Sequence, residues 1–188
     1  MHHIYTTPTF VIHSSPHGEA GKFFLLFTRD LGMIGATAQG VRLSQSKLRY
    51  YTQDFSRSLF SVVRGKEVWR VVGAKEMEEG KRAEIGNKKL YARILSLLKR
   101  LLPGEEKNEK LFEIMDNFYI YLVENNLEKE KMELVEYATV VRILTCLGYV
   151  SHDHIPGSHI DEEILEKVTN SKGIIIKEIN NGLKESQL

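Results

Sequence analysis

The chain has 188 residues, of which 42% are hydrophobic and 27% charged, and its formal net charge at pH 7 is +1. This composition is ordinary for a folded domain and too apolar for a disordered chain. A membrane-spanning helix needs about 20 consecutive apolar residues, and the longest apolar run, residues 23–27, is far shorter. The first residues contain no basic stretch followed by an apolar core, so we expect a cytoplasmic protein.

The charge is divided unevenly along the chain. Residues 1–75 contain ten Lys or Arg against four Asp or Glu, a balance of +6. Residues 76–188 contain sixteen against twenty-one, a balance of −5. A basic front half joined to an acidic back half predicts that a polyanion is bound by the front half alone.

The front half alternates between short β-rich segments and turn signals. The first segment ends at Ser15-Pro16-His17-Gly18, the third is rich in Gly and Ala, and the last two form a hairpin across Arg64-Gly65-Lys66. A polar, basic connection without apolar periodicity, residues 39–51, precedes that hairpin. Five short strands at this spacing predict a small barrel of the OB type. The expected strands are residues 9–15, 22–28, 33–38, 54–64 and 67–73.

In the back half the apolar residues recur at helical spacing. Three amphipathic helices are predicted, and two short ones could follow in the tail, the first capped by Asp161. The polar stretch 80–86 predicts the domain boundary. The expected fold class is therefore α+β with two domains, a five-stranded OB-type β-barrel followed by an all-α helical bundle. The expected domains are a nucleic-acid-binding barrel over residues 1–80 and a helical domain over 84–188, in which 151–188 form the tail.

The ordered signals of the front half resemble the N-terminal domain of the RecO family of recombination mediators. Each matching piece is common by itself, but their order over about 75 residues is fairly specific. In the back half, Phe112 within a helical run and Leu147-Gly148-Tyr149 after the third helix are similar to the family's helical domain. The matching pieces of the front half are Thr9–Glu19, Leu25–Gly32, Ala38–Arg42, Ser46–Arg49 and the strand that opens with Phe55.

The resemblance implies a non-catalytic protein without a cofactor that binds single-stranded DNA. It further implies annealing of complementary strands and loading of the recombinase onto strands covered by single-strand-binding protein, with RecR as partner. Three departures stand out. Gln39 and Leu43 occupy positions that are usually basic, and Cys146, as the single cysteine, excludes the four-cysteine zinc ribbon that many members carry after the Leu-Gly-Tyr position.

Cations and aromatic rings of the front half are the candidates for DNA binding. Lys and Arg bind backbone phosphates with release of counterions, and exposed bases stack on aromatic rings. Arg42, Lys47 and Arg49 are expected to matter most, because they lie in the polar connection. The competing interpretation is a solvated barrel surface with its aromatic residues inside. The predicted DNA-binding residues are Arg29, Arg42, Lys47, Arg49, Tyr50, Tyr51, Arg57, Arg64, Lys66 and Arg70.

The sequence leaves the placement of two further aromatic residues open. Phe60 and Trp69 also lie among these charges and could stack on bases. Phe60 lies on one face of its strand and Phe55 and Leu59 on the other, so one of the two faces must point inward.

No catalytic or metal site is predicted. The chain has no Gly-rich phosphate loop followed by Lys-Ser/Thr, and Ser44-Gln45-Ser46 has no neighbouring motif for nucleophilic catalysis. Cys146 lies among apolar residues and is expected to be a buried core thiol. The histidine-rich loop contains potential metal ligands, but their spacing matches no standard zinc site, so a solvated loop is expected. Those residues are His152, Asp153, His154, His159 and Asp161.

Two alternatives to a DNA-binding protein remain. The same cations and rings would serve an RNA-binding OB protein, because nothing in the sequence reads a 2′-hydroxyl group. A structural adaptor whose barrel binds only protein is the other alternative.

Overall fold

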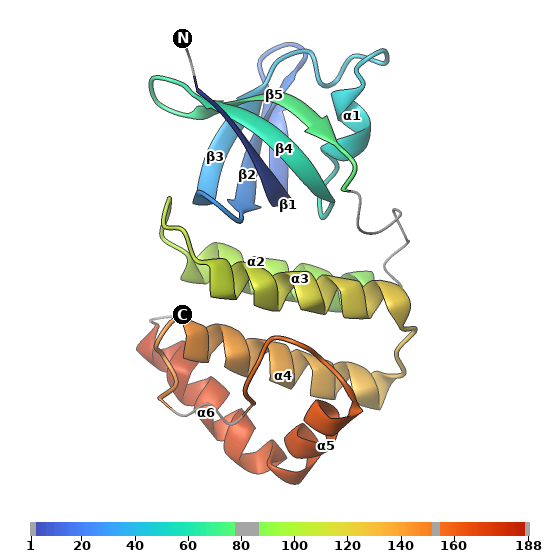
Figure 1. Cartoon of the computed structure of the whole chain (residues 1–188), viewed down its shortest axis with the longest axis vertical. Coiled ribbons are helices and arrows are strands. Elements are labelled where there is room, and N and C mark those ends of the chain that lie inside the picture. The colour runs from blue at the N-terminus through green and yellow to red at the C-terminus, as the bar shows by residue number, and fades with distance from the viewer. Residues whose placement is uncertain (1–2, 78–86, 152–154, 187–188) are drawn as a thin grey trace. The chain divides into compact units, whose positions relative to one another are not determined.

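The structure is a computed structural model of the whole chain, and it describes residues 3–77, 87–151 and 155–186. A closed five-stranded barrel is followed by helices, which confirms the expected α+β class (Figure 1). The barrel part contains β1 (Ile4–His17), β2 (Gly21–Thr28), β3 (Gly32–Ala38), α1 (Leu48–Tyr51), β4 (Arg57–Arg64) and β5 (Trp69–Lys75). The helical part contains α2 (Lys88–Leu101), α3 (Glu109–Glu124), α4 (Lys129–Cys146), α5 (Glu162–Asn170) and α6 (Lys172–Glu185).

These elements form two compact units. The first unit contains the barrel, α1 and the connection Leu102–Glu109 between α2 and α3. The second contains α2, residues 110–124 of α3, and α4 to α6. A segment between two helices of the second unit thus belongs to the barrel unit, which the sequence pattern did not indicate.

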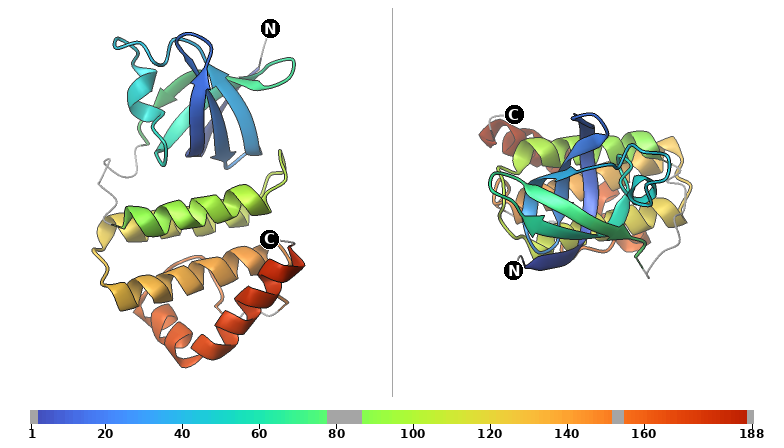
Figure 2. Two further views of the ribbon diagram at one scale, coloured as in Figure 1. Left: turned by 180° about the vertical axis from the view of Figure 1, so that it is seen from behind. Right: turned by 90° about the horizontal axis from the view of Figure 1, so that it is seen from above.

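The strand order of the barrel is β1-β2-β3-β5-β4, with β4 closing onto β1. This is the order of an OB barrel. All neighbouring pairs are antiparallel except β3 and β5, which run parallel and pair only at Ala36 with Trp69 and Thr37 with Arg70. The seam between β3 and β5 is therefore the shortest of the barrel. Figure 2 shows the barrel from behind and from above.

Strand β1 is longer than predicted. Its first half was not expected to be a strand, because it lacks the apolar alternation of a typical strand. Its N-terminal half pairs with β4 from Ile4 to Phe10, and its C-terminal half pairs with β2 from Thr9 to His17. A register shift between Val11 and His13 marks the point where the strand bends. Such a bulge increases the local twist and lets one strand serve two neighbours in a closed sheet.

The core of the barrel decides which aromatic residues remain available to a ligand. Phe60 is 0% exposed and lies inside the barrel, whereas Phe55 is 41% exposed and has a φ of 67°. Phe55 thus lies in the turn before β4, which begins at Arg57 rather than at Asp54 as predicted. The core cluster consists of Val11, Phe24, Leu26, Ile34, Ala36, Ala38, Val41, Phe60, Val62, Trp69 and Val71.

The connection Leu102–Glu109 lies against the free edge of β3. The Met33 N–H donates a hydrogen bond to the Gly104 carbonyl at 3.1 Å. Gly32 has a φ of 72°, and a Cβ atom there would lie 2.2 Å from the Glu106 carbonyl oxygen, so only glycine fits. This contact supplies a partner to part of β3 that does not pair with β5.

The helices of the second unit bury apolar side chains of their own. Tyr91 of α2 contacts Phe118 and Tyr119 of α3, with ring centroids 6.2 Å and 5.7 Å apart. Helices α5 and α6 both pack on α4 (Figures 1 and 2). The predicted cap of α5 is present, since the Ile164 N–H donates to the Asp161 carboxylate at 2.9 Å. Cys146, expected in the core, is only half-buried because it is the last residue of α4.

One arginine lies inside this unit. Arg142 of α4 is 4% exposed and donates hydrogen bonds to the carbonyls of Ile155, Pro156 and Ser158. The loop after α4 is therefore held by a buried guanidinium group. His152, Asp153 and His154 of the predicted histidine-rich loop lie outside the described residues.

Candidate nucleic-acid interface

The connection between β3 and β4 carries the largest group of predicted binding residues. It is ordered by two apolar anchors, since Val41 is 1% exposed in the core cluster and Leu48 packs against that cluster. Between and beyond these anchors the side chains of Arg42, Lys47 and Arg49 are exposed. The apolar anchors fix the backbone and leave the charges in water, as an electrostatic contact with phosphate requires.

The turn between β1 and β2 braces this connection. The Arg42 N–H donates to the Ala20 carbonyl at 3.0 Å, and the Arg42 guanidinium donates to the Glu19 carbonyl at 3.4 Å. The Arg42 backbone is thus fixed by the neighbouring turn. Its side chain is exposed and makes only a long hydrogen bond there.

Two tyrosines lie directly beside these cations. Tyr50 is 55% exposed and Tyr51 is half-buried, and their rings meet edge to face with centroids 5.3 Å apart. An exposed ring held by a neighbouring ring is a suitable platform for a nucleic-acid base. Phe60 and Trp69 cannot serve in this way without unpacking, because both lie in the barrel core.

The hairpin between β4 and β5 brings a second group of cations. Arg64, Lys66 and Arg70 are exposed on it. The short pairing of β5 with β3 places Arg70 beside Thr37, next to the point where the basic connection leaves β3. Arg64 forms an ion pair with Glu105 and lies over the Trp69 ring, with its central carbon 5.0 Å from the ring centroid.

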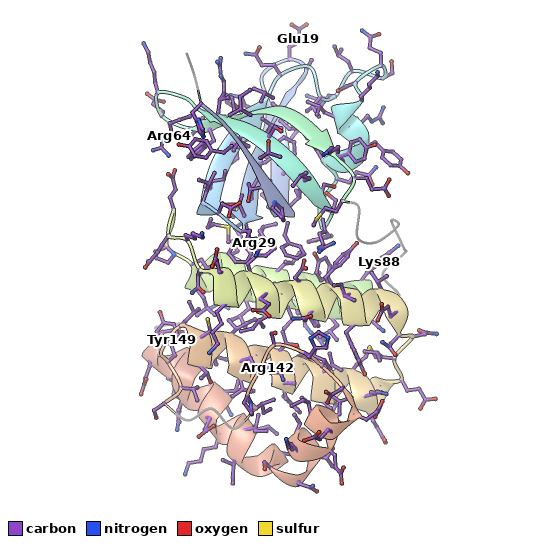
Figure 3. The ribbon with its side chains drawn as sticks, in the orientation of Figure 1. Glu19, Arg29, Arg64, Lys88, Arg142 and Tyr149 are labelled. Carbon is purple, nitrogen blue, oxygen red and sulfur yellow. The ribbon has the colours of Figure 1, made fainter. Side chains whose placement is uncertain are left out.

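Two of the predicted residues lie elsewhere on the barrel. Arg29 lies in the turn between β2 and β3, at the end of the barrel opposite Glu19 (Figure 3). Strand β2 separates these ends by eight residues, or roughly 25 Å. Arg57 is half-buried on β4, opposite Phe10 of β1. The structure therefore does not place Arg29 with the cations of the basic connection.

The charge balance of the halves did not reveal a basic helix in the acidic part. Helix α2 contains no Asp or Glu, and Lys88, Lys89, Arg93, Lys99 and Arg100 are all exposed. Lys89, Arg93 and Arg100 lie near one face at helical spacing, and Arg93 pairs with Glu136 of α4. Counting charges in α2 alone would have identified this surface.

The part of the chain that the structure describes contains no group of three or more His, Cys, Asp or Glu side chains placed to hold a metal ion. Among the same residues no helix is both long and apolar enough to cross a membrane.

Comparison with known proteins decides the family. Residues 1–77 match the model of the recombination protein O N-terminal domain. The chain is 26% identical over 147 residues to the DNA repair protein RecO of Alkaliphilus metalliredigens, with 74% of this chain and 60% of that protein covered. It is 28% identical over 148 residues to RecO of Pelotomaculum thermopropionicum, with 78% and 56% covered. Residues 1–77 thus belong to the family of RecO N-terminal domains, and the longer matches, which reach into the helical unit, are to RecO proteins.

The match to the family is strongest in the barrel. RecO of Heliobacterium modesticaldum is 35% identical over 75 residues, which cover 40% of this chain and 28% of that protein. The chain spans 60% and 56% of the length of the two relatives that match it over both units. The family assignment confirms the resemblance drawn from the motifs between Thr9 and Phe55.

Proposed function

We propose that this chain binds single-stranded DNA without catalysing a reaction, and that it acts in DNA repair by homologous recombination. The observation that carries the proposal is the exposed group Arg42, Lys47, Arg49 and Tyr50 on one anchored segment of an OB barrel. Cations and an aromatic platform on such a barrel suit a strand whose bases are unpaired. The printed name of the relatives, DNA repair protein RecO, points to the same process.

Two further activities belong to this proposal. Annealing of complementary strands requires that bound bases stay accessible, and backbone contacts through Arg and Lys leave the bases free. Loading of the recombinase would involve RecR and single-strand-binding protein as partners, in the cytoplasm. We assign the barrel, residues 1–80, to nucleic-acid binding and the helical domain, residues 84–188, to protein contacts.

A titration of a labelled oligo-dT strand at several salt concentrations tests the proposal. The logarithm of the association constant should fall linearly with the logarithm of the salt concentration, with a slope of about 0.7 per phosphate contacted. A duplex of equal length should bind more weakly, because its stacked bases cannot reach Tyr50 and Tyr51.

Two outcomes would favour other functions. Tighter binding of a matched RNA strand would indicate an RNA-binding OB protein. An affinity for either strand that does not change with salt would contradict phosphate contacts altogether and favour an adaptor that binds protein.

A further inference from the structure

Two hydrogen-bond donors on the β4–β5 hairpin converge on one carboxylate. The Trp69 Nε1–H donates to Glu105 Oε1 at 3.1 Å, and the Arg64 guanidinium donates to Glu105 Oε2. Arg64 also lies over the face of the Trp69 ring, 5.0 Å from its centroid. Each oxygen of the Glu105 carboxylate thus accepts from a different donor, and the two donors are paired neighbours on β4 and β5.

Two donors arranged in this way suit an oxyanion. A phosphate group presents oxygens that accept from guanidinium and N–H donors in the same way as a carboxylate does. The Trp69 indole is fixed in the barrel core, and the Arg64 side chain is restrained by the ring below it. Little conformational entropy remains to be lost when an anion binds between such donors.

The anion in this site is part of the chain itself. Glu105 belongs to Leu102–Glu109, the connection that lies on the barrel unit through Gly32 and Met33. The side chains of Arg64 and Glu105 are 53% and 43% exposed. An ion pair with this exposure contributes little free energy, so a phosphate from solution can replace the carboxylate.

We infer that Arg64 and the Trp69 indole N–H form a binding site for a backbone phosphate of a nucleic-acid strand, and that Glu105 occupies this site when no strand is bound. This inference rests on the proposed function and adds to it. Trp69 is then a phosphate ligand, although its ring is buried. Glu105 competes with the nucleic-acid strand for the same donors. Lys66 and Arg70 lie exposed on the same hairpin.

The first test probes the site with inorganic phosphate. Trp69 is the only tryptophan of the chain, so the ¹⁵N-labelled full-length protein gives a single indole N–H signal that reports on this site alone. In Glu105→Gln, phosphate should shift that signal at a lower concentration than in the wild-type protein. In the double variant Arg64→Gln/Glu105→Gln the response should be lost. An indole signal that does not respond to phosphate in Glu105→Gln would overturn the site.

The second test measures affinity for oligo-dT. Glu105→Gln keeps an acceptor for the indole but removes the competing charge, so binding should become about three- to tenfold tighter and the salt slope steeper by about 0.7. The gain in affinity should disappear when Arg64→Gln/Glu105→Gln is compared with Arg64→Gln. Glu67→Gln is the matched control, because it removes one negative charge from the same hairpin and leaves Glu105 in place.

The outcomes separate the two proposals. Unchanged or weaker binding by Glu105→Gln, a gain that persists without Arg64, or an equal gain in Glu67→Gln would each overturn the inference. A wild-type protein that shows no salt-dependent binding of DNA, but whose Glu105→Gln indole signal responds to phosphate, would refute the proposed function and leave the anion site standing. Glu105→Ala repeats the test without a side-chain amide.

Discussion

The two units use arginine and lysine in opposite ways. In the barrel unit exposed cations lie on the connection between β3 and β4, which is fixed by buried apolar neighbours such as Val41, and on the β4–β5 hairpin. In the helical unit Arg142 is buried among carbonyl groups, and Lys131 and Lys172 pair with Glu162 and Glu133. Exposed cations of the barrel such as Arg42, Lys47 and Arg49 are thus available to a ligand, whereas several cations of the helical unit maintain its own structure.

This difference shows why the net charge of a segment does not by itself identify a surface that can bind nucleic acid. The net charge of −5 over residues 76–188 conceals α2, which has five cations and no acidic residue. What decides whether a cation can meet a phosphate is its exposure and its partners.

Replacement of Arg142 by Met should destabilise the protein most. The substitution keeps an apolar side chain of similar length but leaves three carbonyls around a buried position without their donor. The expected loss in free energy of unfolding is about 3 kcal/mol, measured by urea denaturation. Affinity for oligo-dT of the folded fraction should stay unchanged. Arg93→Met is the control, since its side chain is 60% exposed and surface ion pairs contribute about 1 kcal/mol or less.

Simultaneous replacement of Arg42, Lys47 and Arg49 by Ala should abolish most DNA binding. Three lost phosphate contacts should reduce the salt slope by about 2 and the affinity by more than about tenfold. The melting temperature should change little, because solvated surface charges contribute about half a kcal/mol or less each. If the triple variant instead lost stability and kept its affinity, the basic connection would serve packing rather than binding.

Replacement of Asp161 by Ala should have an intermediate effect on stability alone. The Asp161 carboxylate accepts from the Ile164 N–H at the start of α5, and loss of such a cap costs about 1 kcal/mol. Asp161→Asn keeps the acceptor and should lose only a few tenths of that value. Equal losses in both variants would show that charge, rather than the capping hydrogen bond, stabilises α5.

The smallest effect is expected from the basic face of α2. Replacement of Lys89, Arg93 and Arg100 by Ala removes as many charges as the barrel triple variant. Affinity for oligo-dT should nevertheless fall less than about threefold, because non-specific long-range attraction between charges is screened at physiological salt. A loss as large as that of the barrel variant would break the contrast and make α2 a second surface for nucleic acid.

The contribution of the Lys131–Glu162 contact to stability should depend on pH. The hydrogen bond with Glu162 raises the pKa of Lys131 above its usual value. A raised pKa means that the contribution to stability is present below the unfolded pKa and is lost as the pH rises through the folded pKa. The contact is exposed, so the effect on the melting curve should be small, and Glu162→Gln should remove it.

Local sequence patterns were sufficient to predict those elements that depend mainly on local interactions. The apolar period of α2, α3 and α4 and the Asp161 cap were predicted because each depends on residues within a few positions of one another. The barrel strands were found from alternation and turns, and the five-strand pattern predicted closure. The first half of β1 was missed, because it begins with three exposed residues, contains Pro8 and receives its pairing from β4, about 50 residues away.

The sequence by itself determined the fold class, the resemblance of the barrel to RecO and the basic connection between the third and fourth strands, because these follow from periodicity, composition and ordered motifs. Only the tertiary structure decided which aromatic side chains fill the barrel, since Phe60 and Phe55 both fit an alternating pattern and the inward face depends on strand pairing. It also brought Glu105 to Arg64 and Trp69, across 41 and 36 positions of the chain. Such a contact arises from the free edge of β3, a feature that exists only once the barrel has closed.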